Sequence, residues 1–339
     1  MIKKALLGTS LLVGLGTAPA FAAPDVVVSI APLHSLTSAV MKDVATPTLL
    51  IEGVQSPHSF SLKPSDASKV QNADIIFWIS PDLESFLPKS LASLNPNAKS
   101  VTMDALIDHA DTHEKHDDDK DHDHEHDHKH ENKHADEKHD DHKHEPANDT
   151  HTHDEHAHND DDDHHHHHDK DPHIWLNTEH AIEMVEKIEH ALVEADPDHA
   201  ETYKKNAHEL EERLESLGKE LEKLLTPIKD KPFFVFHDAY GHLQEQYKLN
   251  VAGTVSVSPN QTPGAKRIKE IQHSLAEKNV VCVFSEPQFK AKMVQTIIEG
   301  TSVKTAELDP LGADIPAGPN HYETMMRALA TTINGCLSQ

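Results

Sequence analysis

The chain has 339 residues and carries 32 histidines, 58 acidic and 31 basic side chains, for a formal net charge of −27 with histidine counted as neutral. This balance argues against nucleic acid as a partner, because phosphate binding needs clustered lysine and arginine. It makes cationic ligands, and metal ions above all, the first class to test.

Residues 1–22 have the pattern of a secretory signal peptide. Two lysines precede a short apolar run, and Ala20-Phe21-Ala22 forms an A-x-A cleavage site. The alternative is a membrane anchor, but the apolar run is shorter than the roughly 18 residues that a spanning helix needs. No cysteine near the cleavage site could carry a lipid. We therefore expect an exported chain without stable membrane insertion.

Residues 23–108 alternate apolar runs with helical patterns. The predicted strands are Val26–Ile30, Thr48–Ile51, Ile75–Ile79 and Lys99–Thr102. The predicted helices lie near residues 33–44, 64–72 and 81–92. Strands that alternate with helices imply a parallel sheet covered on both faces. We expect an N-terminal α/β lobe here, which residues 172–196 complete.

Residues 109–171 form a long polar insert. They hold 21 histidines, 24 acidic residues and 7 lysines, and their only apolar side chains are four alanines. Such a stretch cannot bury enough surface to offset the entropy of ordering the chain, so we expect it to be disordered. Most of the excess negative charge of the protein belongs to this insert.

Residues 197–227 are predicted to form one long linking helix. Leucines at spacings of three and four give it one apolar stripe, made of Leu210, Leu214, Leu217, Leu221 and Leu224. Before it, Thr178 is a plausible N-cap of a helix that runs to about Glu194. From the residues alone, the long helix is either a surface helix of one lobe or a rigid rod that joins both lobes.

Residues 228–339 repeat the alternation of the N-terminal lobe. The predicted strands are Phe233–Phe236, Asn250–Thr254, Val280–Phe284 and Val303–Ala306. The predicted helices lie near residues 240–247, 263–278, 288–300 and 320–337. The expected fold class is therefore α/β with two lobes, each a mainly four-stranded parallel sheet flanked by helices.

The two cysteines, Cys282 and Cys336, form an even pair in an exported chain. A disulfide between them would tie the last helix to a buried strand. The alternative is a pair of free thiols that bind a soft metal ion, although no C-x-x-C spacing supports it.

Three histidines outside the insert lie just beyond apolar runs. His58 follows the second predicted strand, His173 lies where the chain becomes apolar again after the insert, and His237 follows the run Phe233–Phe236. In open α/β sheets, ligands bind beyond the carboxyl ends of strands, so these side chains could converge in a cleft. Three neutral imidazoles suit Zn²⁺ better than Mn²⁺ or Mg²⁺, which favour carboxylate oxygen. For any single one of them, a hydrogen-bonded core or turn histidine is the alternative.

Several short motifs follow one another along the mature chain. They are Pro57-His58, Leu62-Lys63-Pro64-Ser65-Asp66, the acidic histidine-rich insert, His173-Ile174-Trp175-Leu176, Phe236-His237-Asp238-Ala239-Tyr240, Glu286-Pro287-Gln288-Phe289 and Leu308-Asp309-Pro310-Leu311-Gly312. With these motifs, essentially the whole mature chain resembles the periplasmic zinc-binding proteins of ABC importers, the ZnuA type of metal-specific solute-binding proteins. The resemblance implies two lobes joined by one long rigid helix, with Zn²⁺ held between them by His58, His173 and His237. The paired cysteines also match zinc-type members.

The same resemblance implies a high-affinity protein of the periplasm that delivers Zn²⁺ to an inner-membrane ABC permease with its cytoplasmic ATPase. We expect a monomer without catalytic activity.

The identity of the fourth zinc ligand is open. Asp309 stands where manganese-type relatives carry a carboxylate ligand, but Asp-Pro followed by Gly is also a common turn signal. Glu286, after a predicted strand, and His34 are weaker candidates for the lining of the cleft.

The insert has two interpretations of its own. It is a solvated charge run that keeps the protein soluble, or its histidines gather zinc at sites that are weaker because a flexible chelate loses entropy on binding. Tethering would then keep the captured ions near the cleft. The imidazoles placed closely enough to chelate are His122, His124, His126 and His128, and His164, His165, His166, His167 and His168.

Three other functions compete with zinc capture for a permease. One is the manganese or iron branch of the same family, which the three histidines and the insert disfavour. Another is zinc storage or buffering by the insert. The last is a zinc hydrolase, since three histidines and a water also form catalytic sites. The chain has neither H-E-x-x-H nor G-x-S-x-G, which argues against hydrolysis.

Overall fold

The computed structural model describes residues 22–107, 171–256, 263–289 and 291–338. The predicted signal peptide, apart from Ala22, and the predicted insert, apart from Asp171, therefore lie outside the described residues. Within these ranges, no helix combines the length and the apolar character that crossing a membrane would need.

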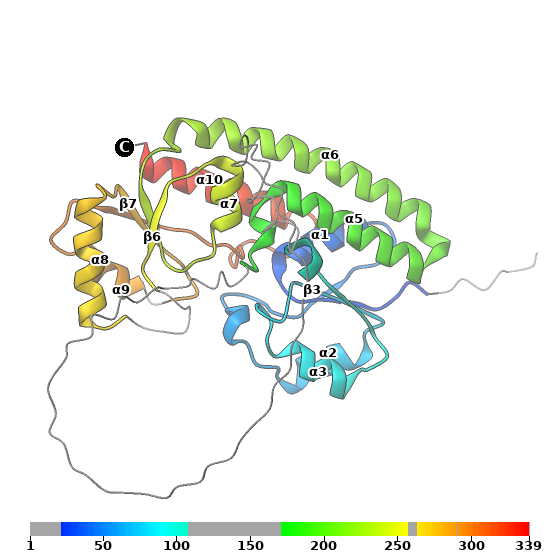
Figure 1. The fold of residues 1–339 in the computed structure, drawn as a ribbon. Helices are drawn as coiled ribbons and strands as arrows, with labels where there is room; N and C mark the ends of the chain where they lie inside the picture. The colour runs from blue at the N-terminus through cyan, green and yellow to red at the C-terminus, as the bar shows by residue number, and fades with distance from the viewer. Residues whose placement is uncertain (1–21, 108–170, 257–262, 290, 339) are drawn as a thin grey trace, which may run out of the picture. The chain divides into compact units, whose positions relative to one another are not determined.

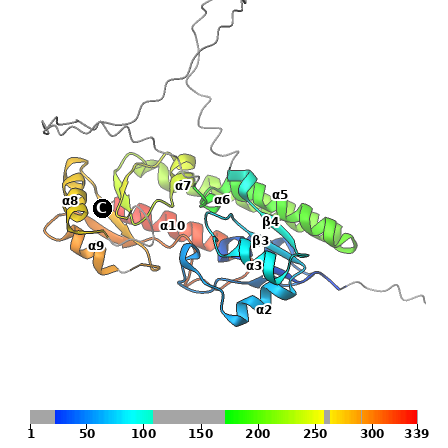
Figure 2. The ribbon, with the colours of Figure 1, turned by 60° about the horizontal axis from the view of Figure 1, so that its bottom comes forward.

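Four parallel strands form the sheet of the N-terminal lobe in the order β2-β1-β3-β4. They are β1 (Val26–Val28), β2 (Thr48–Leu49), β3 (Ile75–Trp78) and β4 (Lys99–Thr102). The connecting helices are α1 (Ala31–Val40), α2 (Pro64–Asn72) and α3 (Leu87–Leu94). Helices α2 and α3 pack side by side (Figure 2). Every residue of β1 and β3 is buried, as expected for central strands of a parallel sheet covered on both faces.

Four parallel strands also form the sheet of the C-terminal lobe, in the order β6-β5-β7-β8. They are β5 (Phe233–Val235), β6 (Val251–Thr254), β7 (Cys282–Ser285) and β8 (Lys304–Glu307). Its helices are α7 (Gly241–Tyr247), α8 (Ala265–Glu277), α9 (Ala291–Ile298) and α10 (His321–Leu337). The prediction of two four-stranded parallel sheets is confirmed.

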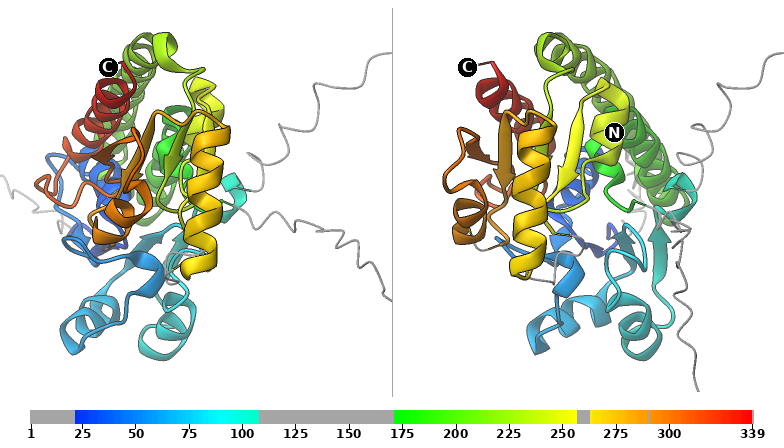
Figure 3. Two further views of the ribbon diagram at one scale, coloured as in Figure 1. Left: turned by 90° about the vertical axis from the view of Figure 1, so that its left-hand side faces the viewer. Right: turned by 60° about the vertical axis from the view of Figure 1, so that its left-hand side comes forward.

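The strands of the second sheet bury alternate side chains in two separate cores. Phe233 and Phe284 belong to the larger core, which also holds Met325 of α10. Phe234 and Val283 belong to a smaller core beneath α8 and α9. Figure 3 shows α8 on one side of these strands and α10 on the other. Because both faces are covered, the strands carry near-continuous apolar runs, which is why they could be recognised in the sequence.

The long predicted helix is α6 (Ala200–Leu225), which packs against α5 (Thr178–Ala195) (Figure 1). It also contacts α1 of the N-terminal lobe and α10 of the C-terminal lobe. Four leucines of the predicted stripe are at most 1 % exposed, namely Leu210, Leu214, Leu217 and Leu221. The fifth, Leu224, is only partly buried, and its neighbour Leu225 is buried instead. The helix therefore links both lobes, which decides between the two interpretations of the sequence.

Several sequence-based predictions of helix ends are wrong. The helix predicted near residues 33–44 is α1, which ends at Val40. The helix predicted at 81–92 begins only at Leu87, where Pro88 occupies the first turn, and residues 81–86 form turns and irregular chain. The N-cap of α5 is Asn177, whose side chain accepts two backbone N–H groups of the first turn. Thr178 is instead the first helical residue. Asparagine is at least as strong a cap as threonine, so local capping chemistry explains the difference.

Cys282 in β7 and Cys336 in α10 form a disulfide, with their Cα atoms 6.3 Å apart. The alternative of two free thiols is therefore wrong. The bond ties the last helix to an inner strand of the second sheet, as the disulfide interpretation predicted.

Candidate metal centre

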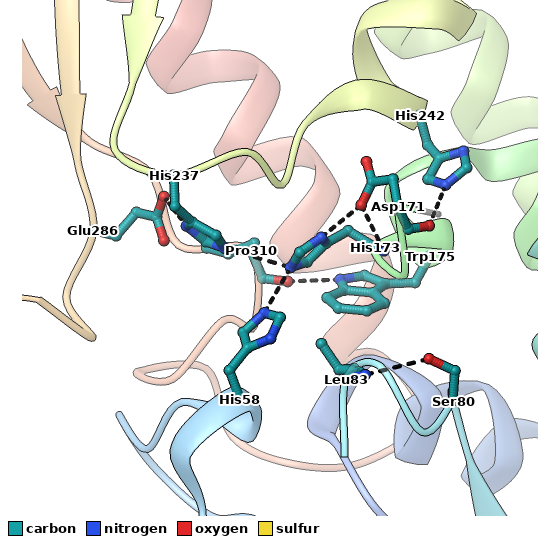
Figure 4. Close-up of polar contacts among 10 residues, drawn as sticks. All are labelled: His58, Ser80, Leu83, Asp171, His173, Trp175, His237, His242, Glu286 and Pro310. Atoms are coloured by element: carbon teal, nitrogen blue, oxygen red, sulfur yellow. Dashed lines mark hydrogen bonds and ion pairs between the residues drawn. The ribbon is translucent and has the colours of Figure 1, made fainter. Parts of the chain in front are cut away.

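Three histidines from separate elements bring their ring nitrogens together (Figure 4). His58 lies in the 3₁₀ turn η1 (Pro57–Ser59), His173 immediately precedes the 3₁₀ turn η2 (Ile174–Leu176), and His237 lies two residues beyond β5. In the part of the chain that the structure describes, they are the one group of three or more His, Cys, Asp or Glu side chains whose donor atoms all lie within 4.8 Å of one another. The structure thus brings together the three histidines that the sequence singled out.

The spacing of the three imidazoles is that of ligands around one small ion. Nε2 of His173 lies 3.2 Å from Nε2 of His58 and 3.4 Å from Nε2 of His237. Nitrogens at two corners of a tetrahedron around Zn²⁺ are about 3.3 to 3.4 Å apart when each Zn–N bond is about 2.0–2.1 Å long. Two of the three nitrogen–nitrogen distances therefore match the edge of a tetrahedral zinc site, and the third lies within 4.8 Å.

The turn that carries His173 is anchored to the C-terminal lobe. The indole Nε1–H of Trp175 donates to the carbonyl oxygen of Pro310 at 2.8 Å, and the hydroxyl of Tyr322 donates to the carbonyl oxygen of Trp175 at 2.8 Å. Both aromatic side chains are at most 1 % exposed. These buried hydrogen bonds hold the backbone next to His173 in one place.

Two of the three histidines are backed by a carboxylate. Nδ1 of His173 lies 2.7 Å from Oδ1 of Asp171, and Nδ1 of His237 lies 2.8 Å from Oε1 of Glu286. Figure 4 shows each carboxylate on the side of its ring that faces away from the cluster of Nε2 atoms. Within the described ranges, His58 makes no such contact. Carboxylates that bind the second nitrogen of a ligand histidine are a common feature of metal sites.

Burial keeps His58 uncharged at neutral pH. Desolvation, together with the electrostatic effect of His173 and His237, lowers the pKa of His58 to about 3. For Asp171, burial alone would raise the pKa, but the charge and hydrogen bonds of His173 outweigh it and lower the pKa to about 2. One ring nitrogen of His58 therefore has a free lone pair, and Asp171 is an anion, over the physiological range.

The histidines enclose a cavity with a volume of about 20 Å³. Its other walls include Trp175, Glu286 and Phe289. A volume of this size holds about one water-sized sphere. The cavity can therefore take one ion.

Both carboxylate oxygens of Asp309 accept hydrogen bonds, two from its own loop and one from Gln288. Oδ1 accepts from the Nε2–H of Gln288 at 2.8 Å and from the N–H of Leu311 at 3.0 Å. Oδ2 accepts from the N–H of Ala313 at 2.6 Å. These contacts fit the turn role that the sequence also allowed, and ligation by Asp309 stays a prediction.

His34 lies elsewhere, in the wall of a second cavity of about 290 Å³ that His321 also lines. Its Nε2 lies 3.0 Å from the carbonyl oxygen of Pro47. Glu286, which the sequence suggested as a possible lining residue, does line the metal cavity.

Sequence reasoning missed Asp171 as a partner of His173. Asp171 was grouped with the acidic insert because of the composition of that stretch, although it lies only two residues before His173. The spacing Asp-x-His just before an apolar run was the signal that could have identified it. The histidines predicted as weak sites in the insert lie outside the described residues.

Comparisons with known proteins agree on one family. A family model described as the periplasmic component A of the zinc-uptake complex, ZnuA, matches residues 26–336. The high-affinity zinc uptake system protein ZnuA of Brucella suis biovar 1 is 42% identical over 341 residues, covering 98% of each chain. The protein of the same name from Haemophilus influenzae is 36% identical, with 100% of both chains covered.

Solved structures agree on the fold. A crystal structure of ZnuA has a TM-score of 0.67 at 23% sequence identity, covering 93% of this chain and 99% of the other. A ZnuA deletion mutant with zinc bound gives the same TM-score and identity, with 94% and 99% covered. At this level of identity, the likeness concerns the arrangement of the elements alone.

Proposed function

The chain belongs to the family of periplasmic ZnuA components of zinc-uptake complexes, and on this basis we propose that it captures Zn²⁺ with His58, His173 and His237. The ion is then delivered to an inner-membrane ABC permease with its cytoplasmic ATPase. The protein works in the periplasm as a monomer, as a binding protein without catalytic activity. The names of the relatives support the cargo, and the description of the family model supports the compartment.

The observation that carries this proposal is the spacing of the Nε2 atoms. The distances of 3.2 and 3.4 Å match the edge of a zinc tetrahedron, and the donors are neutral nitrogen atoms, which suit Zn²⁺. Three protein ligands leave the fourth position to water or to a further group. Zn²⁺ is the cargo here, so a site built mainly of neutral donors is compatible with its later release.

The competing functions fit the site less well. Manganese favours carboxylate oxygen, and non-haem iron sites commonly combine two histidines with one carboxylate, but the carboxylates of Asp171 and Glu286 contact the Nδ1 atoms of the histidines. A hydrolase needs room for its substrate beside the metal-bound water, typically at least about 300 Å³. The cavity of about 20 Å³ does not provide this room.

For the insert, we propose that its histidines gather zinc at weaker sites and keep it close to the cleft. This follows from its composition of 21 histidines in 63 residues and from the high effective concentration that a tether gives. Storage by the insert alone would leave the three-histidine centre without a role.

Zinc titration of the metal-free protein against a competing chelator tests the proposal. We expect one tight site and several weaker ones. His58→Ala, His173→Ala or His237→Ala should weaken the tight site by more than the roughly 100-fold that an outer partner can contribute. His273→Ala, on an exposed part of α8 where the side chain is 75% accessible, is the matched control and should leave the tight site unchanged.

Deletion of residues 109–168 separates the two kinds of site. The weaker sites should disappear and the tight site should keep its affinity, because all three proposed ligands lie outside the deleted segment. Loss of the tight site in the deletion variant would show that the assignment to the three histidines is wrong.

A further inference from the structure

We propose that Glu286 is a positioning residue for zinc capture, which fixes the tautomer and the orientation of His237. This inference rests on the proposed function, because it assumes that Nε2 of His237 binds the ion. Glu286 follows β7 directly, and His237 follows the neighbouring strand β5, so the sheet brings the two side chains to the same edge.

The contact itself dictates where the imidazole carries its proton. Oε1 of Glu286 lies 2.8 Å from Nδ1 of His237. A carboxylate oxygen only accepts hydrogen bonds, so Nδ1 must be the protonated nitrogen. The metal-binding form of histidine is the neutral imidazole, which has one N–H; in that form Nε2 carries the lone pair, and Nε2 lies in the cluster of ring nitrogens.

The other tautomer would be wrong for binding. With the proton on Nε2, the ring would present an N–H to the ion instead of a lone pair. In water, neither tautomer of a neutral imidazole is held, so part of the population would have to change before binding. A fixed tautomer removes this cost, and it also holds the ring plane at the angle that the cluster requires.

The surroundings of Glu286 indicate that the carboxylate serves the histidine. The residue is only 1 % exposed, and burying a carboxylate is costly unless it is paired. Its Oε1 pairs with His237, and the hydroxyl of Tyr240 also lies near the carboxylate. The short contact with a candidate ligand gives this buried carboxylate a role at the metal centre.

The three histidines are consequently held to different degrees. His173 has the equivalent contact with Asp171 at 2.7 Å, whereas His58 has no carboxylate partner among the described residues. Two ligands are thus set in advance, and His58, from the N-terminal lobe, completes the site.

The test compares Glu286→Gln with the wild-type full-length protein. Glutamine keeps the size of the side chain, but it is a weaker acceptor and can turn its NH₂ group toward Nδ1, which favours a proton on Nε2. We expect the zinc affinity to fall by about 10- to 100-fold. In the metal-free protein, imidazole ¹⁵N chemical shifts should change from the Nδ1–H form of His237 to a mixture of tautomers.

Glu84→Gln is the matched control. Glu84 is also a buried carboxylate, at 0% exposure, but its hydrogen bonds go to Ser29 and to two backbone N–H groups of the N-terminal lobe. This change should leave the zinc affinity and the tautomer of His237 as they are.

A double-mutant cycle with His237→Ala shows whether Glu286 acts through the histidine. In that background, Glu286→Gln should cause no further loss of affinity. Wild-type affinity in Glu286→Gln, or a full further loss in the double variant, would overturn the proposal.

If the glutamine variant does not fold, Glu286→Asp replaces it, since aspartate keeps the charge and withdraws the carboxylate from His237. Weaker zinc binding supports the role of Glu286, and unchanged binding contradicts it. Failure of the proposed function is distinguishable, because His237→Ala alone would then retain the tight site.

Discussion

In the wild-type protein, ionisation of Glu84 in the N-terminal lobe should lower the free energy of unfolding as the pH rises. Replacement of Glu84 by glutamine should remove most of this loss. The carboxylate is fully buried. It accepts from the hydroxyl of Ser29 at 2.5 Å and from the N–H groups of Ile79 and Ser80 at 3.2 and 3.0 Å. Burial raises the pKa of Glu84 from 4.5 to about 7, although the hydrogen bonds lower it in part.

The sign of the effect follows from the two pKa values. Between pH 4.5 and about 7, the folded state holds a proton that the unfolded state has already released. The free energy of unfolding therefore falls as the pH rises through this window, and the full cost is present above it. At about 1.4 kcal/mol for each pH unit, the cost reaches about 3 kcal/mol.

Glutamine does not titrate, so Glu84→Gln should lack this term. Its NH₂ group cannot accept from one of the two backbone N–H groups, which costs about 1–3 kcal/mol at every pH. In acid, the free energy of unfolding of the variant should therefore be lower than that of wild type. Toward pH 8.5, wild type loses about 3 kcal/mol that the variant keeps, so the difference should disappear or change sign.

Urea denaturation of the zinc-free proteins from about pH 4.5 to 8.5, followed by the fluorescence of Trp78 and Trp175, measures the difference. All other titrating groups, including those of the insert, are common to both proteins and cancel. If the two stability curves run parallel over the whole range, the burial of a titrating carboxylate at Glu84 is not the source of any pH dependence, and the reasoning is refuted.

Two further predictions concern the C-terminal lobe. Replacing Cys282 and Cys336 together by alanine opens a loop with a sequence separation of 54, which should lower the free energy of unfolding by about 4 kcal/mol in the chain-entropy model. Denaturation without reductant measures this loss, and zinc titration should still find the tight site; a loss of that site would mean that the disulfide shapes the metal centre. Gly312→Ala should destabilise the protein by about 1–3 kcal/mol, because Gly312 has a φ of +66° and an added Cβ would lie 2.8 Å from Nε2 of His321. A thermal unfolding midpoint equal to that of wild type would contradict the backbone strain inferred there.

The sequence alone led to the fold class and to the three central histidines. Alternating strands and helices could be recognised because both faces of each sheet are buried, so that β3 and β7 read as continuous apolar runs. His58 and His237 stood out because they follow such runs, at the edge where α/β sheets bind ligands. Helix ends were less predictable, since they depend on which of two neighbouring residues, such as Asn177 and Thr178, has its oxygen free to cap.

Other features were decided only by the tertiary structure. The leucine stripe of α6 required a buried face, but only packing showed that this helix contacts α1 in one lobe and α10 in the other. Asp171 was grouped with the insert, and Glu286 was only a weaker candidate for the lining of the cleft, because an acidic residue is more often solvated than paired with a ligand. Periodicity and capping depend on neighbours within a few residues, so they can be recognised in the sequence. The distances within the metal centre join residues that are 64 and 115 positions apart, and only the closing of the whole chain around its cores fixes them.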